Sequence, residues 1–279
     1  MTLAELTAWL KQELGQAECM ALLSHYLNIS TETTYSQPDL PIEKDARYYA
    51  LLEAVSRRVE KKIPLQYILG KAWFYAEEFI VTPDVLIPRP ETELLVEEVL
   101  ATFPDSPLDI LDLATGSGCM AITLKKHRPL WRVTATDSSR AALAIAQQNA
   151  DLHQTEIRFL HGHWFDPLAN EAFDGIVCNP PYIDSADRTT LTPEVLSEPH
   201  QALFPPDSPQ DLYRYLFNRL QFYLKPDSKA WFELGEGQST WIKPLAESLG
   251  YRIYCIQDYQ HIDRIAVLSK MLQYSPIGY

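Results

Sequence analysis

The chain has 279 residues, and at about 150 residues per domain this length suggests two domains. Its hydrophobic fraction of 46% and charged fraction of 22% are those of a folded globular protein, which argues against disorder and against a membrane span. The formal net charge of −13 argues against a nucleic-acid-binding protein, because such proteins carry a clustered basic surface. A basic protein partner fits this charge balance.

The four cysteines are far apart and form no C-x-x-C pair, so we expect neither a metal site nor a disulfide framework, and reduced thiols instead. The N-terminal residues lack the apolar segment of a signal peptide, and no stretch approaches the roughly 18 apolar residues that span a bilayer. We therefore expect a cytoplasmic protein without a membrane segment or a bound metal. A monomer is assumed. The cysteines are Cys19, Cys119, Cys178 and Cys255.

The first part of the chain has apolar residues at helical spacing, from Leu3, Leu6 and Leu10 to Leu51 and Val55. This spacing predicts a small helical domain over residues 1–63. A different texture then begins at Pro64.

A connector is expected over residues 64–90. Aromatic and β-branched residues from Tyr67 to Val81 precede prolines at 83, 88 and 90, a pattern typical of a hairpin-like segment.

Residues 91–279 alternate helical spacing with short apolar strands. Such alternation predicts an α/β domain with a mostly parallel, Rossmann-like sheet and helices on both faces. Ligands of such sheets bind beyond the carboxyl ends of the strands. The expected strands are 108–113, 131–136, 157–160, 175–178, 230–234 and 252–257, and the expected helices are 91–103, 120–126, 140–152 and 211–224.

A loop of small residues follows the first of these strands and precedes a helix. Small side chains let a ligand approach the backbone, and the amides of the helix start face it. A tight strand-to-helix turn would look similar. The loop contains Ala114, Thr115, Gly116, Ser117 and Gly118.

An acidic residue, Asp137, ends the next strand, nineteen positions after Gly118. This spacing suits a carboxylate that accepts hydrogen bonds from both ribose hydroxyls of a nucleoside. Asp137 could instead cap the helix that begins near Arg140. Together with the loop it favours an adenosine-containing ligand. The stretch 116–121 also fits the G-x-G-x-x-A fingerprint, so an NAD-dependent oxidoreductase competes at this point.

The motif that decides the chemistry is Asn179-Pro180-Pro181-Tyr182, directly after the expected strand 175–178. Two prolines stiffen the backbone and remove two N–H donors, which leaves carbonyls and the Asn179 side chain as acceptors. Such acceptors would orient a planar amide or exocyclic amine, and Tyr182 would pack on its flat face. An ordinary rigid turn is the alternative.

A planar nitrogen is a weak nucleophile, and the sulfonium of S-adenosylmethionine is the methyl donor that suits it. Alignment for the in-line displacement would supply much of the acceleration, since well-oriented reactants gain roughly 7–11 kcal/mol. No general base is required before attack, because the proton can leave once the nitrogen is cationic.

These motifs resemble the PrmC/HemK family, the class I methyltransferases that modify the glutamine of the Gly-Gly-Gln loop in class 1 peptide chain release factors. The resemblance rests on residues 64–70, 86–93 with Ile-Pro-Arg-Pro-Glu-Thr-Glu, the glycine loop, Asp137, 179–183 and 198–199. It implies that 91–279 form an S-adenosylmethionine-dependent methyltransferase domain.

By this resemblance, residues 114–118, Asp137, Trp164 and Asn179 contact the donor. Asn179 to Tyr182 hold the substrate glutamine, with Asn179, Pro180 and Tyr182 as the catalytic residues. Trp164 alone would be interpreted as a core aromatic, and the resemblance places it beside the adenine.

Two departures from the family pattern stand out. Ala114 occupies a position where the family usually has glycine, which adds up to about 1 kcal/mol of strain if that position needs a positive φ. Pro205-Pro206-Asp207 replaces a glycine-rich turn and affects a surface loop.

Other functions remain open at the level of sequence. An adenine N6 methyltransferase of nucleic acid shares the Asn-Pro-Pro-Tyr signature, although the acidic charge balance weighs against it. A ribosomal-protein glutamine methyltransferase would carry the same motifs. A protein that only binds a nucleotide and a partner would be expected to have a broken catalytic loop. We expect the helical domain 1–63 to recognise the substrate protein.

Overall fold

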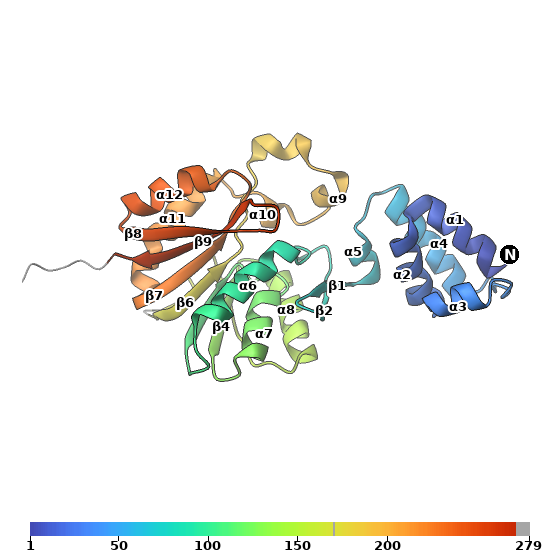
Figure 1. Ribbon diagram of the computed structural model, residues 1–279, viewed down its shortest axis with the longest axis horizontal. Coiled ribbons are helices and arrows are strands. Elements are labelled where there is room, and N and C mark those ends of the chain that lie inside the picture. Colours follow the sequence, from blue (N-terminus) through green and yellow to red (C-terminus); the bar gives the residue numbers. More distant parts are fainter. Residues whose placement is uncertain (170, 272–279) are drawn as a thin grey trace, which may run out of the picture. The chain divides into compact units, whose positions relative to one another are not determined.

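The computed structural model describes residues 1–169 and 171–271, which form two compact units (Figure 1). The first unit contains Met1–Lys71 together with Leu191–Ser197, and the second contains the rest of the described chain. The first boundary falls inside the segment 64–90 that the sequence predicts as a connector. In the described part of the chain, no helix has the length and apolar character that a bilayer crossing requires.

The first unit is helical, as the sequence predicts. Helix α1 begins with a capping box, in which the Thr2 hydroxyl accepts from the Glu5 amide and the Glu5 carboxylate accepts from the Thr2 amide. Leu6 and Leu10 of α1 are fully buried in the core of this unit. Its helices are α1 (Leu3–Leu14), α2 (Gln16–Leu27), α3 (Thr31–Ser36), α4 (Ala46–Val59), α5 (Leu65–Leu69) and α9 (Pro193–Leu196).

The short α9 is far from α4 in sequence but belongs to the same unit. Arg58 of α4 lies between two carboxylates and donates to Glu18 at 2.9 Å and to Glu194 at 3.0 Å. These three half-buried side chains join α2, α4 and α9.

The connector prediction is correct in one part and wrong in another. A two-stranded sheet, β1 (Lys71–Phe74) and β2 (Glu77–Ile80), forms the expected hairpin, and its turn residues Tyr75 and Ala76 both have positive φ. Tyr67 lies in helix α5 instead of an extended segment. The reason is local: Pro64 stands at the N-cap, and Gly70 ends the helix in the left-handed conformation.

The second unit is built on a seven-stranded sheet in the order β5-β4-β3-β6-β7-β9-β8. The first five strands in this order are parallel, and β9 pairs antiparallel with both β7 and β8. The mostly parallel sheet is as predicted, and β9 is a strand that the sequence analysis missed. The strands are β3 (Asp109–Leu113), β4 (Arg132–Asp137), β5 (Arg158–His161), β6 (Phe173–Cys178), β7 (Leu224–Glu233), β8 (Tyr251–Gln257) and β9 (Asp263–Lys270).

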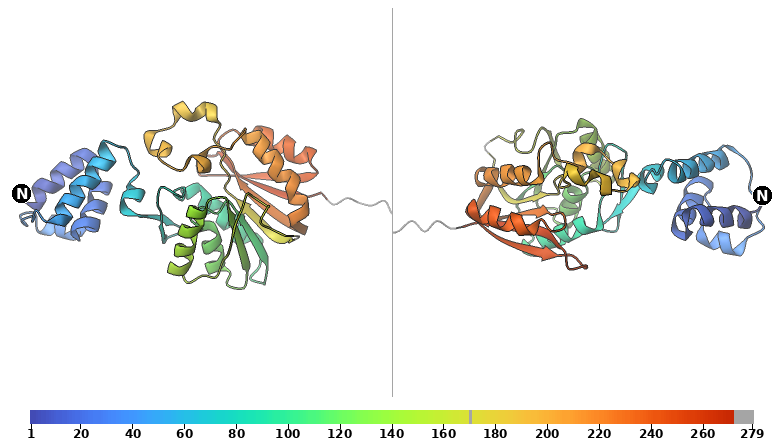
Figure 2. Two further views of the ribbon diagram at one scale, coloured as in Figure 1. Left: turned by 180° about the vertical axis from the view of Figure 1, so that it is seen from behind. Right: turned by 90° about the horizontal axis from the view of Figure 1, so that it is seen from above.

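Helices cover both faces of this sheet (Figures 1 and 2). On one face lie α6 (Pro90–Thr102), α7 (Cys119–His127) and α8 (Arg140–Leu152), and on the other α11 (Pro209–Tyr223) and α12 (Ser239–Ser248). The short helices η1 (Ser185–Thr190) and α10 (His200–Leu203) follow β6.

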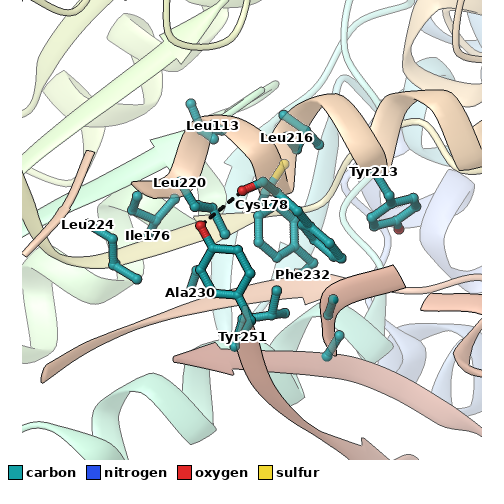
Figure 3. Packing of buried hydrophobic residues seen from close by; sticks show 14 of the residues in the cluster. Leu113, Ile176, Cys178, Tyr213, Leu216, Leu220, Leu224, Ala230, Phe232 and Tyr251 are labelled. Carbon is teal, nitrogen blue, oxygen red and sulfur yellow. Dashed lines mark hydrogen bonds between the residues drawn. The ribbon is translucent and has the colours of Figure 1, made fainter. Parts of the chain in front are cut away.

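Side chains of the central strands alternate between two cores, as the pleat of a strand requires. Ile176 and Cys178 of β6 pack with Leu216 and Leu220 of α11, as Figure 3 shows, whereas Val177 points to the core under α6 and α7. Because both faces are buried, the carboxyl ends of the parallel strands are where the sheet opens to ligands.

Candidate active site

A cavity lies at the carboxyl ends of β3, β4 and β6, within the second unit. Its empty space amounts to about 810 Å³, which includes space open to solvent. The predicted glycine loop and the start of the Asn-Pro-Pro-Tyr loop line the same cavity. Of the five predicted loop residues, Gly118 does not line it. Its walls come from residues 84–86, Pro88, Arg89, Thr92, residues 114–117, Cys119, Met120, Asp137, Ser138, Ala142, Trp164, Asn179, Pro181, Pro199, Gln201 and Ala202.

The glycine loop turns through left-handed backbone. Gly116 has φ +55°, and a Cβ built there would meet no atom within 4 Å, so the residue presents bare backbone to open space. Gly118 has φ +81° and packs tightly, because a Cβ there would come within 3.1 Å of Ile122 and 3.2 Å of Ala146. The two glycines therefore serve different needs: one leaves room for a ligand and the other lets α7 approach α8.

Ala114 also has a positive φ, of 56°. The departure from the family pattern thus falls at a position where the conformation favours glycine. An alanine in this region carries up to about 1 kcal/mol of backbone strain.

Asp137 is held from both sides at the cavity wall. Its Oδ2 accepts from the Gly116 amide at 2.9 Å, and its Oδ1 accepts from the Ser139 amide at 2.8 Å. Ser139 is the N-cap residue of α8, and its own hydroxyl accepts from the Ala142 amide, so Asp137 does not cap this helix and remains part of the cavity lining. Burial raises the pKa of the Asp137 carboxyl, although these amide hydrogen bonds act in the opposite direction.

A second carboxyl, Asp112, lies fully buried beneath the glycine loop. Its Oδ2 accepts from the Thr115 hydroxyl at 2.6 Å. Burial raises the pKa of Asp112 to about 7, against the effect of this hydrogen bond. The sequence analysis gave Asp112 no role.

The sequence analysis gave two interpretations of Trp164, a core aromatic and a residue at the ligand site, and features of both are present. It is half-buried against the core under α11, and it also lines the cavity. The Trp164 backbone has a φ of 48°, in the left-handed region, within the turn after β5, and its carbonyl accepts from the Thr136 hydroxyl at 3.2 Å. An adjoining hollow shares this tryptophan with residues 204–207, the segment that departs from the family pattern.

The Asn-Pro-Pro-Tyr loop follows β6, the fourth strand of the large sheet, as predicted. Asn179 and Pro181 line the cavity, whereas Pro180 and Tyr182 are not among its lining residues. The Tyr182 carbonyl accepts from Gln238 Nε2 at 2.7 Å. The loop is therefore fixed at its far end by the segment that leads into α12.

The other end of the loop contacts α6. Asn179 Nδ2 donates to the Thr92 hydroxyl oxygen at 3.1 Å, and the Thr92 hydroxyl donates to Glu233 Oε2 at 2.6 Å. Tyr182 donates through its hydroxyl to Glu233 Oε1 at 3.2 Å. Glu233 was missed from the sequence, because it appears there as the polar end of an apolar strand.

The segment before α6 is fixed by a buried acid. Glu198 accepts from the Ile87 amide at 3.0 Å and forms an ion pair with Arg89. Arg89 and the neighbouring Pro199 both line the cavity. This contact joins the two segments 86–93 and 198–199, for which the sequence analysis had no physical link.

All four cysteines are free, and within residues 1–169 and 171–271 no three His, Cys, Asp or Glu side chains gather in a metal-binding group.

The sheet order, the cavity at the carboxyl ends of the strands and the loop after β6 together define a class I methyltransferase. Residues 90–206 match the family model "Methyltransferase small domain", and residues 3–70 match the "PrmC N-terminal domain". The fold is shared with a methyltransferase from Pyrococcus furiosus, with a TM-score of 0.55 at 18% identity, over 81% of this chain and 98% of that one. A 16S rRNA N2 methyltransferase from Thermus thermophilus, solved with AdoMet and guanosine, has a TM-score of 0.53 at 16% identity, over 72% of this chain and 50% of that one.

Sequence relatives narrow the class. A release factor glutamine methyltransferase of Enterococcus faecalis is 40% identical over 76% of this chain and 75% of its own length. One from Geobacter sulfurreducens is 38% identical over 91% of this chain and 89% of its own length. The chain belongs to the release factor glutamine methyltransferase family, whose members are S-adenosylmethionine-dependent enzymes.

Proposed function

We propose that the chain transfers a methyl group from S-adenosylmethionine to the side-chain amide nitrogen of the glutamine in the Gly-Gly-Gln loop of class 1 peptide chain release factors. The observation that carries this proposal is the shared cavity. It brings Asn179 and Pro181 to the same space as the glycine loop and Asp137, although they are far apart in sequence.

The residues present suit the methyl donor. Asp137 offers a carboxylate to ribose hydroxyls, and bare backbone at Gly116 gives a nucleoside close access. Trp164 supplies an aromatic wall for a flat purine. The five loop residues 114–118, Asp137, Trp164 and Asn179 are the donor contacts that we propose.

The glutamine amide would be held by Asn179 and by the carbonyls of Pro180 and its neighbours. Because the Asn179 amide nitrogen donates to Thr92, the Asn179 carbonyl oxygen remains as an acceptor for a substrate N–H. We propose Asn179, Pro180 and Tyr182 as catalytic residues, and all four residues of the loop as the substrate site.

The reaction balances as a simple displacement. The glutamine nitrogen forms a bond to the methyl carbon while the carbon–sulfur bond breaks, and its electron pair passes to sulfur to leave S-adenosylhomocysteine. The nitrogen is then cationic and loses one proton to water. The donor supplies the electrophilic methyl group, and the chain supplies alignment and exclusion of water.

The first unit carries no part of this cavity among its residues 1–71. We propose that it recognises the release factor at a surface distant from the glutamine, and that the enzyme works in the cytoplasm, where its substrate acts. We propose that the enzyme acts as a monomer.

A methyl-transfer assay with the full chain and tritiated donor tests the function. Three acceptors are compared: a class 1 release factor, ribosomal protein and DNA. We expect label in the release factor, and none in a release factor whose Gly-Gly-Gln glutamine is replaced by alanine. Label in the ribosomal protein or in DNA, without label in the release factor, would overturn the proposal in favour of the corresponding alternative.

A further inference from the structure

Four side chains form a continuous hydrogen-bonded relay that starts at the cavity wall with Asn179 and Thr92 and continues behind it to Glu233 and Tyr182. Thr92 and Glu233 are almost completely buried, with 3% and 1% of their surface exposed. They come from α6 and from the end of β7, and they connect the two ends of the Asn-Pro-Pro-Tyr loop. The relay therefore fixes both the first and the last residue of that loop.

The direction of each hydrogen bond follows from the number of available protons. An ionised Glu233 can only accept, so the single hydroxyl proton of Thr92 points to its Oε2 at 2.6 Å. The Thr92 oxygen is then an acceptor, and Asn179 must present its NH₂ group at 3.1 Å. This leaves the oxygen of the Asn179 amide on the opposite side, available to the substrate.

We propose that Thr92 and Glu233 are positioning residues that hold the Asn179 amide with its oxygen toward the substrate, and that this orientation depends on the charge of Glu233. The proposal rests on the proposed function, and it adds two residues and a pH dependence to that site. Neither residue needs to touch the substrate.

Protonation of Glu233 would undo the orientation. A neutral carboxylic acid can donate to Thr92, the Thr92 hydroxyl can then donate to Asn179, and the Asn179 amide can turn to present its oxygen to Thr92. The substrate would meet an NH₂ group where it needs an acceptor. Methyl transfer is therefore expected to fall when Glu233 takes up a proton.

The surroundings of Glu233 make this protonation accessible near neutral pH. The pKa of Glu233 is raised to about 7, mainly by burial. The hydroxyl donors Thr92 and Tyr182 act against this rise, Glu91 of α6 adds to it, and Arg264 of β9 opposes it. Among the described residues, four further titratable groups that interact with Glu233 have pKa values raised by burial and stay neutral in this range. They are Cys119 of α7, Cys178 of β6, Tyr182 of the loop and Tyr213 of α11.

The first test replaces Thr92 in the full-length enzyme and measures single-turnover transfer, the Michaelis constant for the release factor and donor affinity. Thr92→Val keeps the shape and removes the hydroxyl, so we expect a loss of about tenfold or more in transfer, with donor affinity changed less than about twofold. Thr92→Ser restores the hydroxyl and should restore most of the rate.

Thr123→Val is the matched control for this change. Thr123 is equally buried, on α7, and its hydroxyl has no hydrogen-bond partner among the described residues. The control should transfer methyl groups as fast as the wild type. A Thr92→Val enzyme as fast as this control would refute the relay, while a wild type that does not methylate the release factor at all would refute the proposed function itself.

The second test compares Glu233→Gln with the wild type across pH, from about two units below the pKa of Glu233 to about two units above it. At high pH we expect the wild type to transfer methyl groups about tenfold faster or more than Glu233→Gln. This ratio of rates should shrink toward low pH, where Glu233 of the wild type is neutral. The ratio cancels any titration that both proteins share, such as that of Asp112. A ratio that stays constant with pH would overturn the charge dependence.

Discussion

The Asp137 carboxylate and the Gly116 backbone amide are joined by a hydrogen bond of 2.9 Å, which ties the end of β4 to the glycine loop. The carboxylate that is proposed to bind the ribose thus also shapes the loop beside it. Changes at Asp137 should affect the donor twice, through a lost contact and through a looser loop.

For Asp137→Ala we expect donor binding to weaken by about 1.5–3 kcal/mol, because a charged acceptor for hydroxyl groups is lost. Isothermal calorimetry with S-adenosylmethionine and with S-adenosylhomocysteine measures this, and both ligands should weaken in parallel. Asp151→Ala, which removes an exposed acid from the end of α8, is the control and should bind both normally. Preference of the wild type for NAD over S-adenosylmethionine would revive the oxidoreductase interpretation.

Asn179→Ala should show the opposite pattern. The main proposed role of Asn179 is to hold the substrate amide, so we expect the affinity for the donor to stay nearly intact. The rate of single-turnover transfer should fall by about a hundredfold, because a positioned hydrogen bond is lost from the transition state. Calorimetry and rapid-quench transfer separate the two effects. Normal turnover in this variant would remove Asn179 from the mechanism.

Ala114→Gly should stabilise the protein. The φ of 56° at Ala114 is strained for alanine, so glycine should raise the free energy of unfolding by up to about 1 kcal/mol, as measured by urea denaturation. The control is Ala144→Gly, at an exposed position inside α8. This change should lower the free energy of unfolding by roughly the same amount, because glycine weakens the middle of a helix. If Ala114→Gly lowers the free energy of unfolding as much as the control does, the backbone of Ala114 is not strained.

Asp112 predicts a pH dependence of stability. Its pKa is raised from 3.8 to about 7, so the folded state holds this proton more tightly than the unfolded state. The stabilising contribution is complete below the unfolded pKa and is lost as the pH rises through about 7. Relative to the wild type, Asp112→Asn should therefore gain unfolding free energy between about pH 4 and about pH 8. Urea titrations of both proteins at each pH measure the difference in their free energies of unfolding. A difference that does not change with pH would contradict the raised pKa of Asp112.

Removal of residues 1 to about 63 tests the recognition role of the first unit. Donor binding should survive, while the Michaelis constant for the intact release factor rises toward that for a short Gly-Gly-Gln peptide. Because Glu194 would lose Arg58 as a partner, a thermal melt must first show that the shortened protein is folded. A folded shortened enzyme that keeps the native preference for the whole release factor would refute the recognition role.

Much of the second unit could be predicted from local pattern. Strands 109–113 and 173–178 are rich in apolar residues because both of their faces are buried, and the loops that follow them carry Gly116 and Asn179. The sequence places a loop at a strand end, and the parallel sheet then brings such ends together. Family membership agrees with the motif 86–93 and with the Asn-Pro-Pro-Tyr loop.

The relay could not be predicted in this way. Thr92 is 87 residues from Asn179 and 141 from Glu233, and no periodicity connects them. Helix α6 and strand β7 have to pack before the three side chains meet. Strand β9 was missed for a related reason: its apolar core, residues 265–268, is short, and its position between β7 and β8 depends on tertiary pairing.

The position of β9 has a consequence for synthesis of the chain. Strand β8 (Tyr251–Gln257) is made before β9 (Asp263–Lys270), yet β9 is the strand that separates it from β7. Until β9 leaves the ribosome, β7 keeps an open edge of unpaired amides and carbonyls, and β8 has no place in the sheet. Because Glu233 ends β7, the relay that orients Asn179 is completed only after β9 has paired with β7. A nascent chain halted before Asp263 would contain every residue of the donor site, but its sheet would be unfinished and could not hold the relay.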